Sequence, residues 1–147
     1  MVCITWIIVV WVPTVMKFSF NITFNTLGIG ILKLITKPVL NKIATRVEGN
    51  TFENLGTNSI ESVDYTDYAN ELSRRISLDN NKKGVLICGT GVGMSVAANK
   101  FKNIRAGLVY NSEVAKLIRE HNDANILILP GRYMNITEAK KCVENFL

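Results

Sequence analysis

The chain of 147 residues holds a single histidine, three cysteines and three prolines, and these shortages exclude several kinds of site. The cysteines, Cys3, Cys88 and Cys142, form no C-x-x-C pair and show no spacing typical of metal ligands. With only His121 to add to them, neither a zinc site nor a disulfide framework is predicted. We therefore expect a protein of a reducing compartment, the cytoplasm, that needs no metal and no other cofactor.

The sequence also lacks both common nucleotide-binding motifs. No Gly-Lys-Ser or Gly-Lys-Thr is present, so a phosphate-cradling Walker loop is excluded. The one glycine-rich segment, GTGVG at residues 89–93, has the spacing G-x-G-x-G instead of the G-x-G-x-x-G of dinucleotide sites. The next acidic residue at about the required distance of ~20 positions, Glu113, is expected at a helix start and not at a strand end.

The positive charge is confined to one part of the chain. The net charge is +5, but residues 1–50 carry five basic and one acidic side chain, whereas residues 51–147 carry twelve basic and eleven acidic ones. A nucleic-acid-binding surface needs a basic stripe on a folded face, and residues 51–147 contain none. We expect no nucleic-acid partner.

The first fifty residues differ in character from the rest. Residues 1–16 are apolar and uncharged, but Pro13 interrupts them and they are shorter than the ~20 residues of a membrane span. No basic region or cleavage site typical of a secretory signal is present. We divide the chain into a divergent apolar N-terminal segment, residues 1–50, and an α/β domain, residues 51–147. A membrane anchor within residues 1–32 is the alternative for the first segment.

From residue 52 onward, short apolar strands alternate with amphipathic helices. Strands are predicted at residues 85–88, 104–110 and 125–129, and helices at residues 64–76, 94–101, 112–120 and from about 137 to the C-terminus. Asn111 or Ser112 would cap the third helix, with Val114, Leu117 and Ile118 facing inward, and Asn135 or Thr137 would cap the last. Such alternation predicts a parallel sheet with right-handed crossovers, a Rossmann-like three-layer αβα fold.

In such a fold, ligands bind at the carboxyl ends of the strands. Three loops are expected there, at residues 89–93, 110–112 and 130–133. The first offers backbone N–H groups that suit an anion or a developing oxyanion, and the third offers Arg132 for a phosphate or carboxylate. Cys88 ends the strand before the glycines, where it is either a reactive thiolate or a packed strand residue.

His121 is expected at the C-terminal end of its helix, at the sheet edge opposite the strand tips. Within one subunit it should therefore lie far from Cys88. It is either a helix C-cap, where a cation favours the helix dipole, or a residue that a second subunit presents across a symmetric interface.

Four segments together resemble the ribose-5-phosphate isomerase type B family, which includes the galactose-6-phosphate isomerase subunits. They are LGTNSIESVDYTDYA, GVLICGTGVGMSVAANK, NIRAGL and REHNDANILI. The resemblance covers residues 52–147, about two thirds of the chain. It implies an aldose–ketose isomerase that moves a proton between C1 and C2 of ribose 5-phosphate and ribulose 5-phosphate through an enediolate.

The resemblance also implies roles for individual residues. Cys88 is the base that moves the proton, Thr90 assists near the reacting carbons, and His121 opens the furanose ring. The substrate would be bound by the glycine loop with Ser95, by Asn122, by Arg132 through the phosphate, and by Tyr65 lining the pocket; the loop residues are Gly89, Gly91 and Gly93. His121 and Asn122 would come from the neighbouring subunit, so a homodimer or a dimer of dimers with shared active sites is expected.

Two features of the family pattern are missing from this sequence. The Asp-His pair near the family's N-terminus has no counterpart in residues 1–50, and the arginine-bearing stretch expected beyond Leu147 is absent. We hypothesise that residues 1–50 are not the ancestral N-terminus and expect weakened phosphate binding. Alternatives within the same family are a catalytically inactive remnant or assembly subunit, and a galactose-6-phosphate isomerase.

Overall fold

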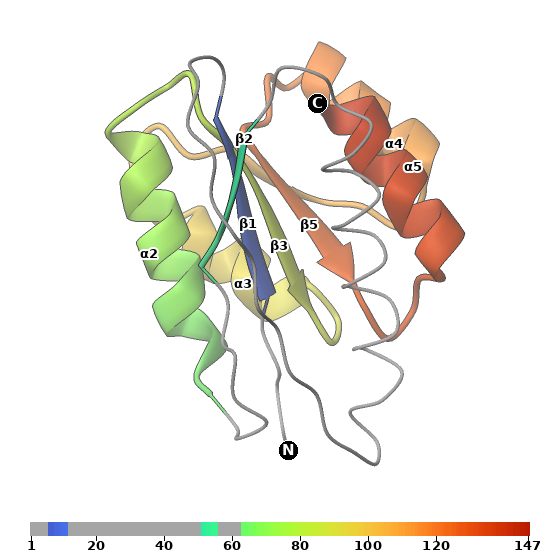
Figure 1. The fold of residues 1–147 in the computed structure, drawn as a ribbon, viewed down its shortest axis with the longest axis horizontal. Helices are drawn as coiled ribbons and strands as arrows, with labels where there is room; N and C mark the ends of the chain where they lie inside the picture. Colours follow the sequence, from blue (N-terminus) through green and yellow to red (C-terminus); the bar gives the residue numbers. More distant parts are fainter. Residues whose placement is uncertain (1–5, 12–50, 56–62) are drawn as a thin grey trace.

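A computed structural model describes residues 6–11, 51–55 and 63–147, which build one five-stranded sheet with helices on both faces (Figure 1). The strand order is β2-β1-β3-β5-β4. The strands are β1 (Trp6–Trp11), β2 (Thr51–Asn54), β3 (Lys83–Cys88), β4 (Ala106–Leu108) and β5 (Ile126–Pro130). The helices are α2 (Tyr65–Ser77), α3 (Val92–Ala98), α4 (Ser112–Glu120) and α5 (Ile136–Phe146).

The predicted parallel sheet is formed by β3, β5 and β4. Both β3 and β4 run parallel to β5, which lies between them. Residues 84–88 and all of β5 are buried, as expected for strands covered on both faces. The α/β fold class is confirmed, and its short apolar strands were the signal that predicted it.

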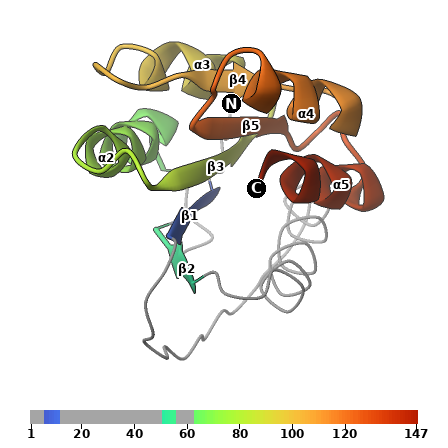
Figure 2. The same ribbon diagram turned by 90° about the horizontal axis from the view of Figure 1, so that it is seen from above.

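The helices form two layers, α2 with α3 and α4 with α5, on opposite sides of the sheet (Figure 2). Each face of the sheet has its own hydrophobic core, and alternate residues of β3 belong to one or the other. Leu86 and Cys88 face α2 and α3, whereas Val85 and Ile87 face α4 and α5. From β3 the chain crosses to β4 at the edge of the sheet, and it then returns to form β5 between these two strands. With right-handed crossovers, this reversal requires α3 and α4 to lie on opposite faces.

Three of the helices begin at a side-chain cap. Asp64 accepts from the Thr66 N–H, Asn111 from Val114 and Asn135 from Glu138. These bonds satisfy backbone donors that the first helical turn leaves unpaired. Of the two alternatives predicted for α4 and for α5, the asparagine is the cap in both.

Strands β1 and β2 were not predicted, and they make the sheet mixed. β1 runs antiparallel to both β2 and β3, with Trp6 opposite Ile87 and Val10 opposite Lys83. Residues 6–11 are therefore a sheet strand, contrary to the membrane-anchor alternative; the remainder of residues 1–32 lies outside the described residues. No helix in the described ranges is long and apolar enough to cross a bilayer.

The predicted inward face of α4 was partly wrong. Ala115 is fully buried and Ile118 packs against the core, but Val114 and Leu117 are exposed. The helix carries apolar residues over more of its circumference than the core covers, so the pattern alone did not separate the two faces.

The open edge of β4 is closed by the side chain of Asn99. Its amide group donates to the Ala106 carbonyl at 2.9 Å and accepts from the Ala106 N–H at 2.9 Å, as a neighbouring strand would. The same Nδ2 group donates to the Ser95 carbonyl at 3.0 Å, which ties the end of α3 to β4. Blocking an edge strand in this way prevents its pairing with another chain.

Replacing Asn99 by alanine is expected to lower the free energy of unfolding by about 1–3 kcal/mol, because the hydrogen bonds to residues 95 and 106 are lost. Urea unfolding followed by circular dichroism measures the change. Asn81→Ala in an exposed turn is the matched control and should change it by less than about 0.5 kcal/mol. Equal effects of the two substitutions would contradict the role given to Asn99.

Candidate active site

The carboxyl ends of β3 and β5 lie side by side at a switch point of the sheet, because the helices that follow them, α3 and α5, pack on opposite faces. Cys88, the last residue of β3, pairs with Pro130 of β5. The pairing continues into the loops, where the Gly131 N–H donates to the Cys88 carbonyl at 2.8 Å and the Arg132 N–H donates to the Gly89 carbonyl at 3.1 Å. Such a switch point is where open α/β sheets bind ligands.

Cys88 lies at this switch point. It is 2% exposed, and its Sγ accepts a hydrogen bond from the Gly91 N–H at an N–S distance of 3.2 Å. Thr90, between these two residues, is exposed, and its Oγ1 accepts from the Val92 N–H at 3.4 Å. The sulfur and the hydroxyl thus belong to one turn that joins β3 to α3.

The three glycines of this turn are positions where other side chains occupy the space of a Cβ. A Cβ on Gly89 would lie 3.2 Å from Arg132 Nε, and one on Gly93 would lie 2.7 Å from Tyr65 Cζ. At Gly91 it would lie 2.3 Å from Leu108 Cδ1, too close for any real contact. The loop is therefore framed by an arginine, a tyrosine and a leucine from three other elements.

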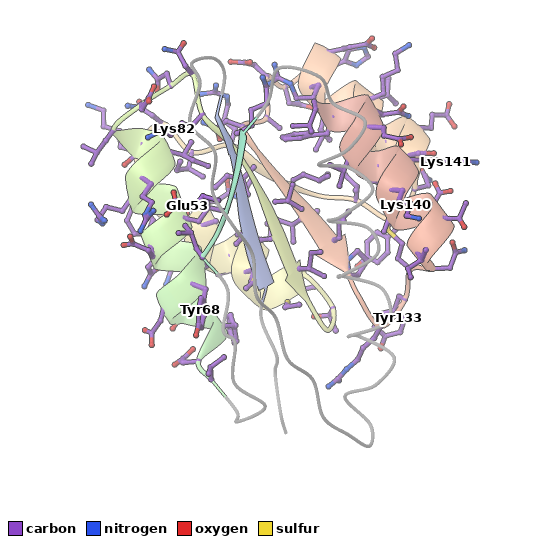
Figure 3. All side chains as sticks on the ribbon, in the orientation of Figure 1. Glu53, Tyr68, Lys82, Tyr133, Lys140 and Lys141 are labelled. Atoms are coloured by element: carbon purple, nitrogen blue, oxygen red, sulfur yellow. The ribbon has the colours of Figure 1, made fainter. Side chains whose placement is uncertain are left out.

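Six of the predicted site residues other than the cysteine come together here: Tyr65, Gly89, Thr90, Gly91, Gly93 and Arg132. Ser95 lies one turn into α3, where its N–H donates to the Gly91 carbonyl at 3.0 Å. Leu108 was not predicted as part of the site. Its role could not be found from the sequence, because it depends on β4 lying next to the turn. Tyr133, labelled in Figure 3, follows the β5 strand and is largely exposed.

His121 and Asn122 are not part of this cluster. His121 is the C-cap of α4, with its N–H donating to the Leu117 carbonyl at 2.8 Å, and both residues are exposed. They precede β5 and so lie at its amino end, opposite Cys88. Next to them, Asp123 has a φ of 47° and forms ion pairs with Arg105 and Arg119, which hold its pKa below the usual value.

The second described cysteine, Cys142, has a different environment. It lies in the core between the sheet and the helices α4 and α5, with its Sγ 3.9 Å from the Met134 sulfur. Burial, helped by the charge of Glu138, raises the pKa of its thiol to about 12, so it remains protonated and inert near neutral pH. Within the described ranges, no three His, Cys, Asp or Glu residues are grouped so that they could hold a metal ion.

Fold and site together define an α/β protein with a cysteine, a glycine turn and an arginine at the switch point of its parallel strands. Residues 19–147 match the family model described as Ribose/Galactose Isomerase, and the chain belongs to this family. The match begins well before residue 52, where the resemblance seen in the sequence begins, so the family likeness also includes much of the segment that we expected to diverge.

Individual relatives and solved structures agree with this assignment. The ribose-5-phosphate isomerase B of Escherichia coli is 42% identical over 92 residues, which are 63% of this chain and 62% of that protein. The crystal structure of a ribose 5-phosphate isomerase from Thermotoga maritima has a TM-score of 0.70 at 41% identity and covers 79% of each chain. The ribose-5-phosphate isomerase B of Mycoplasma genitalium with bound ribulose-5-phosphate has a TM-score of 0.64 at 35% identity, with 81% of this chain and 76% of that chain covered.

A test of the site's packing is the substitution Gly93→Ala. The added methyl group would meet the Tyr65 ring at 2.7–2.8 Å, and we expect it to lower the free energy of unfolding by about 1–3 kcal/mol. In a Tyr65→Ala background the obstacle is gone, so the same substitution should cost less than about 1 kcal/mol, including its helix-propensity gain over glycine. Urea unfolding of the four proteins measures this coupling. Additive effects would show that the ring and Gly93 do not share this space.

Proposed function

We propose that the protein interconverts ribose 5-phosphate and ribulose 5-phosphate, with Cys88 as the base. The observation that carries the proposal is the corner at the end of β3, where a buried sulfur, a glycine turn and Arg132 come together. The family assignment supports it, as does the solved relative that holds ribulose-5-phosphate. A cytoplasmic location is proposed with it, because the three cysteines are scattered along the sequence and form no C-x-x-C pair.

The chemistry needs a base and a cradle for negative charge. In the ring-opened aldose, the Cys88 thiolate takes the proton from C2, and the electron pair of that C–H bond forms the C1–C2 double bond while charge appears on O1. Donors in the glycine turn, with Thr90 beside them, stabilise the resulting enediolate. A proton shift from O2 to O1 and return of the proton from sulfur to C1 give the ketose.

Arg132 is proposed to bind the phosphate, and Tyr65 to line the pocket. The guanidinium lies over Gly89 and is exposed, so a charged ligand can reach it from solution. Arg132 lies against the first glycine of the turn, Gly89, and Tyr65 lies against the last, Gly93. A sugar phosphate that extends along the turn from Gly89 to Gly93 would contact both side chains.

Opening the furanose ring is assigned to His121, with Asn122 contacting sugar oxygens, and both are proposed to come from a second copy of the chain. Within one chain they lie at the opposite edge of the sheet, so a homodimer is required for them to act. Several apolar side chains around the edge strand β4 remain exposed and suit such an interface. They are Val92 and Val96 of α3, Tyr110 after β4, and Val114 and Leu117 of α4.

The reaction is tested first by Cys88→Ala in an assay of ribose 5-phosphate conversion. Loss of the base is expected to lower kcat by about 10²–10⁴-fold. Cys142→Ala is the matched control. This sulfur lies in the core between the sheet and the helices α4 and α5, so the substitution should leave kcat within about twofold of the unaltered protein. Turnover by Cys88→Ala within tenfold of the unaltered protein would overturn the assignment, and no turnover by any of the three proteins would favour the inactive assembly subunit.

The shared site is tested by mixing two inactive variants, Cys88→Ala and His121→Ala. If each site takes Cys88 from one copy and His121 from the other, half of the randomly formed dimers hold one intact site. Co-expression should then restore roughly a quarter of the unaltered activity. If both residues act within one copy, no dimer holds an intact site and the mixture stays inactive.

A further inference from the structure

The N–H of Gly91 forms a hydrogen bond in this structure that its expected role in binding the enediolate does not explain. It donates to the Cys88 sulfur at 3.2 Å, and both residues are buried. An amide N–H hydrogen bonds more strongly to a thiolate than to a thiol, because the negative charge strengthens the bond. The bond therefore favours the form of the sulfur that can take a proton.

The backbone conformation at residue 91 favours glycine over every other residue type. Gly91 has a φ of 78° and a ψ of −22°, in the left-handed region that glycine adopts at little cost. This conformation directs the chain into α3, which begins at the next residue, while the N–H of residue 91 faces the Cys88 sulfur at the end of β3. Leu108 and Ile128 fill the space where a Cβ would project, at 2.3 Å and 3.1 Å from it.

We propose that Gly91 is a positioning residue for Cys88, whose backbone N–H holds the sulfur as a thiolate at the end of β3. This inference rests on the proposed function and assigns different tasks to the backbone donors of the turn. The N–H of residue 91 serves the base, and the enediolate is left to the other donors around the turn. The requirement for glycine at position 91 arises from the positive φ and from Leu108 and Ile128, which fill the space of a Cβ.

Other groups around this corner affect the sulfur as well. The guanidinium of Arg132 lies against Gly89, and its charge also favours a thiolate; Tyr65 packs against Gly93, and Tyr68 packs against the core cluster that includes Cys88. A test must therefore remove the N–H alone and leave these side chains in place. Exchange of the amide of residue 91 for an ester does this, because it keeps the glycine backbone and adds no Cβ.

The measured quantity is the pH dependence of alkylation of Cys88 by iodoacetamide, followed by peptide mass spectrometry so that Cys3 and Cys142 are resolved from it. With the ester at residue 91, the midpoint should rise by about one to two pH units, the effect expected for losing a hydrogen bond to a charged group. The matched control is an ester at Lys100, whose N–H donates to the Ala97 carbonyl at the end of α3. The control should leave the midpoint where it is in the unaltered protein.

A second measurement needs no variant. In the unaltered protein, the amide proton of Gly91, followed by nuclear magnetic resonance, should shift with the same pH midpoint as the alkylation. An unchanged midpoint in the ester protein, or a Gly91 proton that does not respond to pH, would overturn the inference. Neither readout depends on turnover, so failure of the proposed isomerase activity would be recognised separately.

Discussion

The site depends on one steric fact, the absence of side chains at three alternate positions after β3. Arg132, Leu108 and Tyr65 fill the space that side chains at Gly89, Gly91 and Gly93 would need. Because these residues come from the loop after β5, from β4 and from α2, the turn joins most of the described fold at one point. A close approach of backbone to other groups is the usual reason for glycine at a functional turn.

The register of β3 against β5 determines which residues lie next to this turn. The pairing of Cys88 with Pro130 continues through the bonds from Gly131 and Arg132 to the two carbonyls at the end of β3. An arginine close in space to the cysteine, yet 44 positions away in the sequence (132 − 88), follows directly from parallel pairing. The same topology sends His121 to the other edge, because a helix between parallel strands runs back along the sheet. One chain therefore brings Cys88, the glycine turn and Arg132 together but leaves His121 at the opposite edge.

Much of this arrangement could be predicted from the sequence, for identifiable reasons. The runs GVLIC and NILIL are too apolar for anything but buried strands, and Asn111 and Asn135 stand where a helix needs a cap. Which loops share a sheet edge then follows from parallel topology alone. These local signals were sufficient because each agreed with the global fold.

The rest required the structure because it depends on contacts between distant segments. The strand Trp6–Trp11 reads as an apolar run that could be a strand or part of an anchor, and only its pairing with β3 decides between them. The exposure of Val114 and Leu117 depends on where the core ends, which no periodicity reveals. Leu108 beside Gly91 is a contact between two elements whose neighbourhood is set by strand order, with β5 inserted between β3 and β4.

The two described cysteines show that burial by itself does not define the environment of a sulfur. Cys88 and Cys142 are both almost fully buried, at 2% and 0% exposure. Around Cys142 the neighbours are the Met134 thioether and the negative charge of Glu138, and neither the low polarity nor that charge tolerates a thiolate. Around Cys88 the chain turns so that a backbone N–H faces the sulfur and an arginine covers the adjacent glycine. The chemistry that a buried thiol can perform is thus decided by the dipoles and charges directed at it, and in this fold the backbone itself supplies one of them.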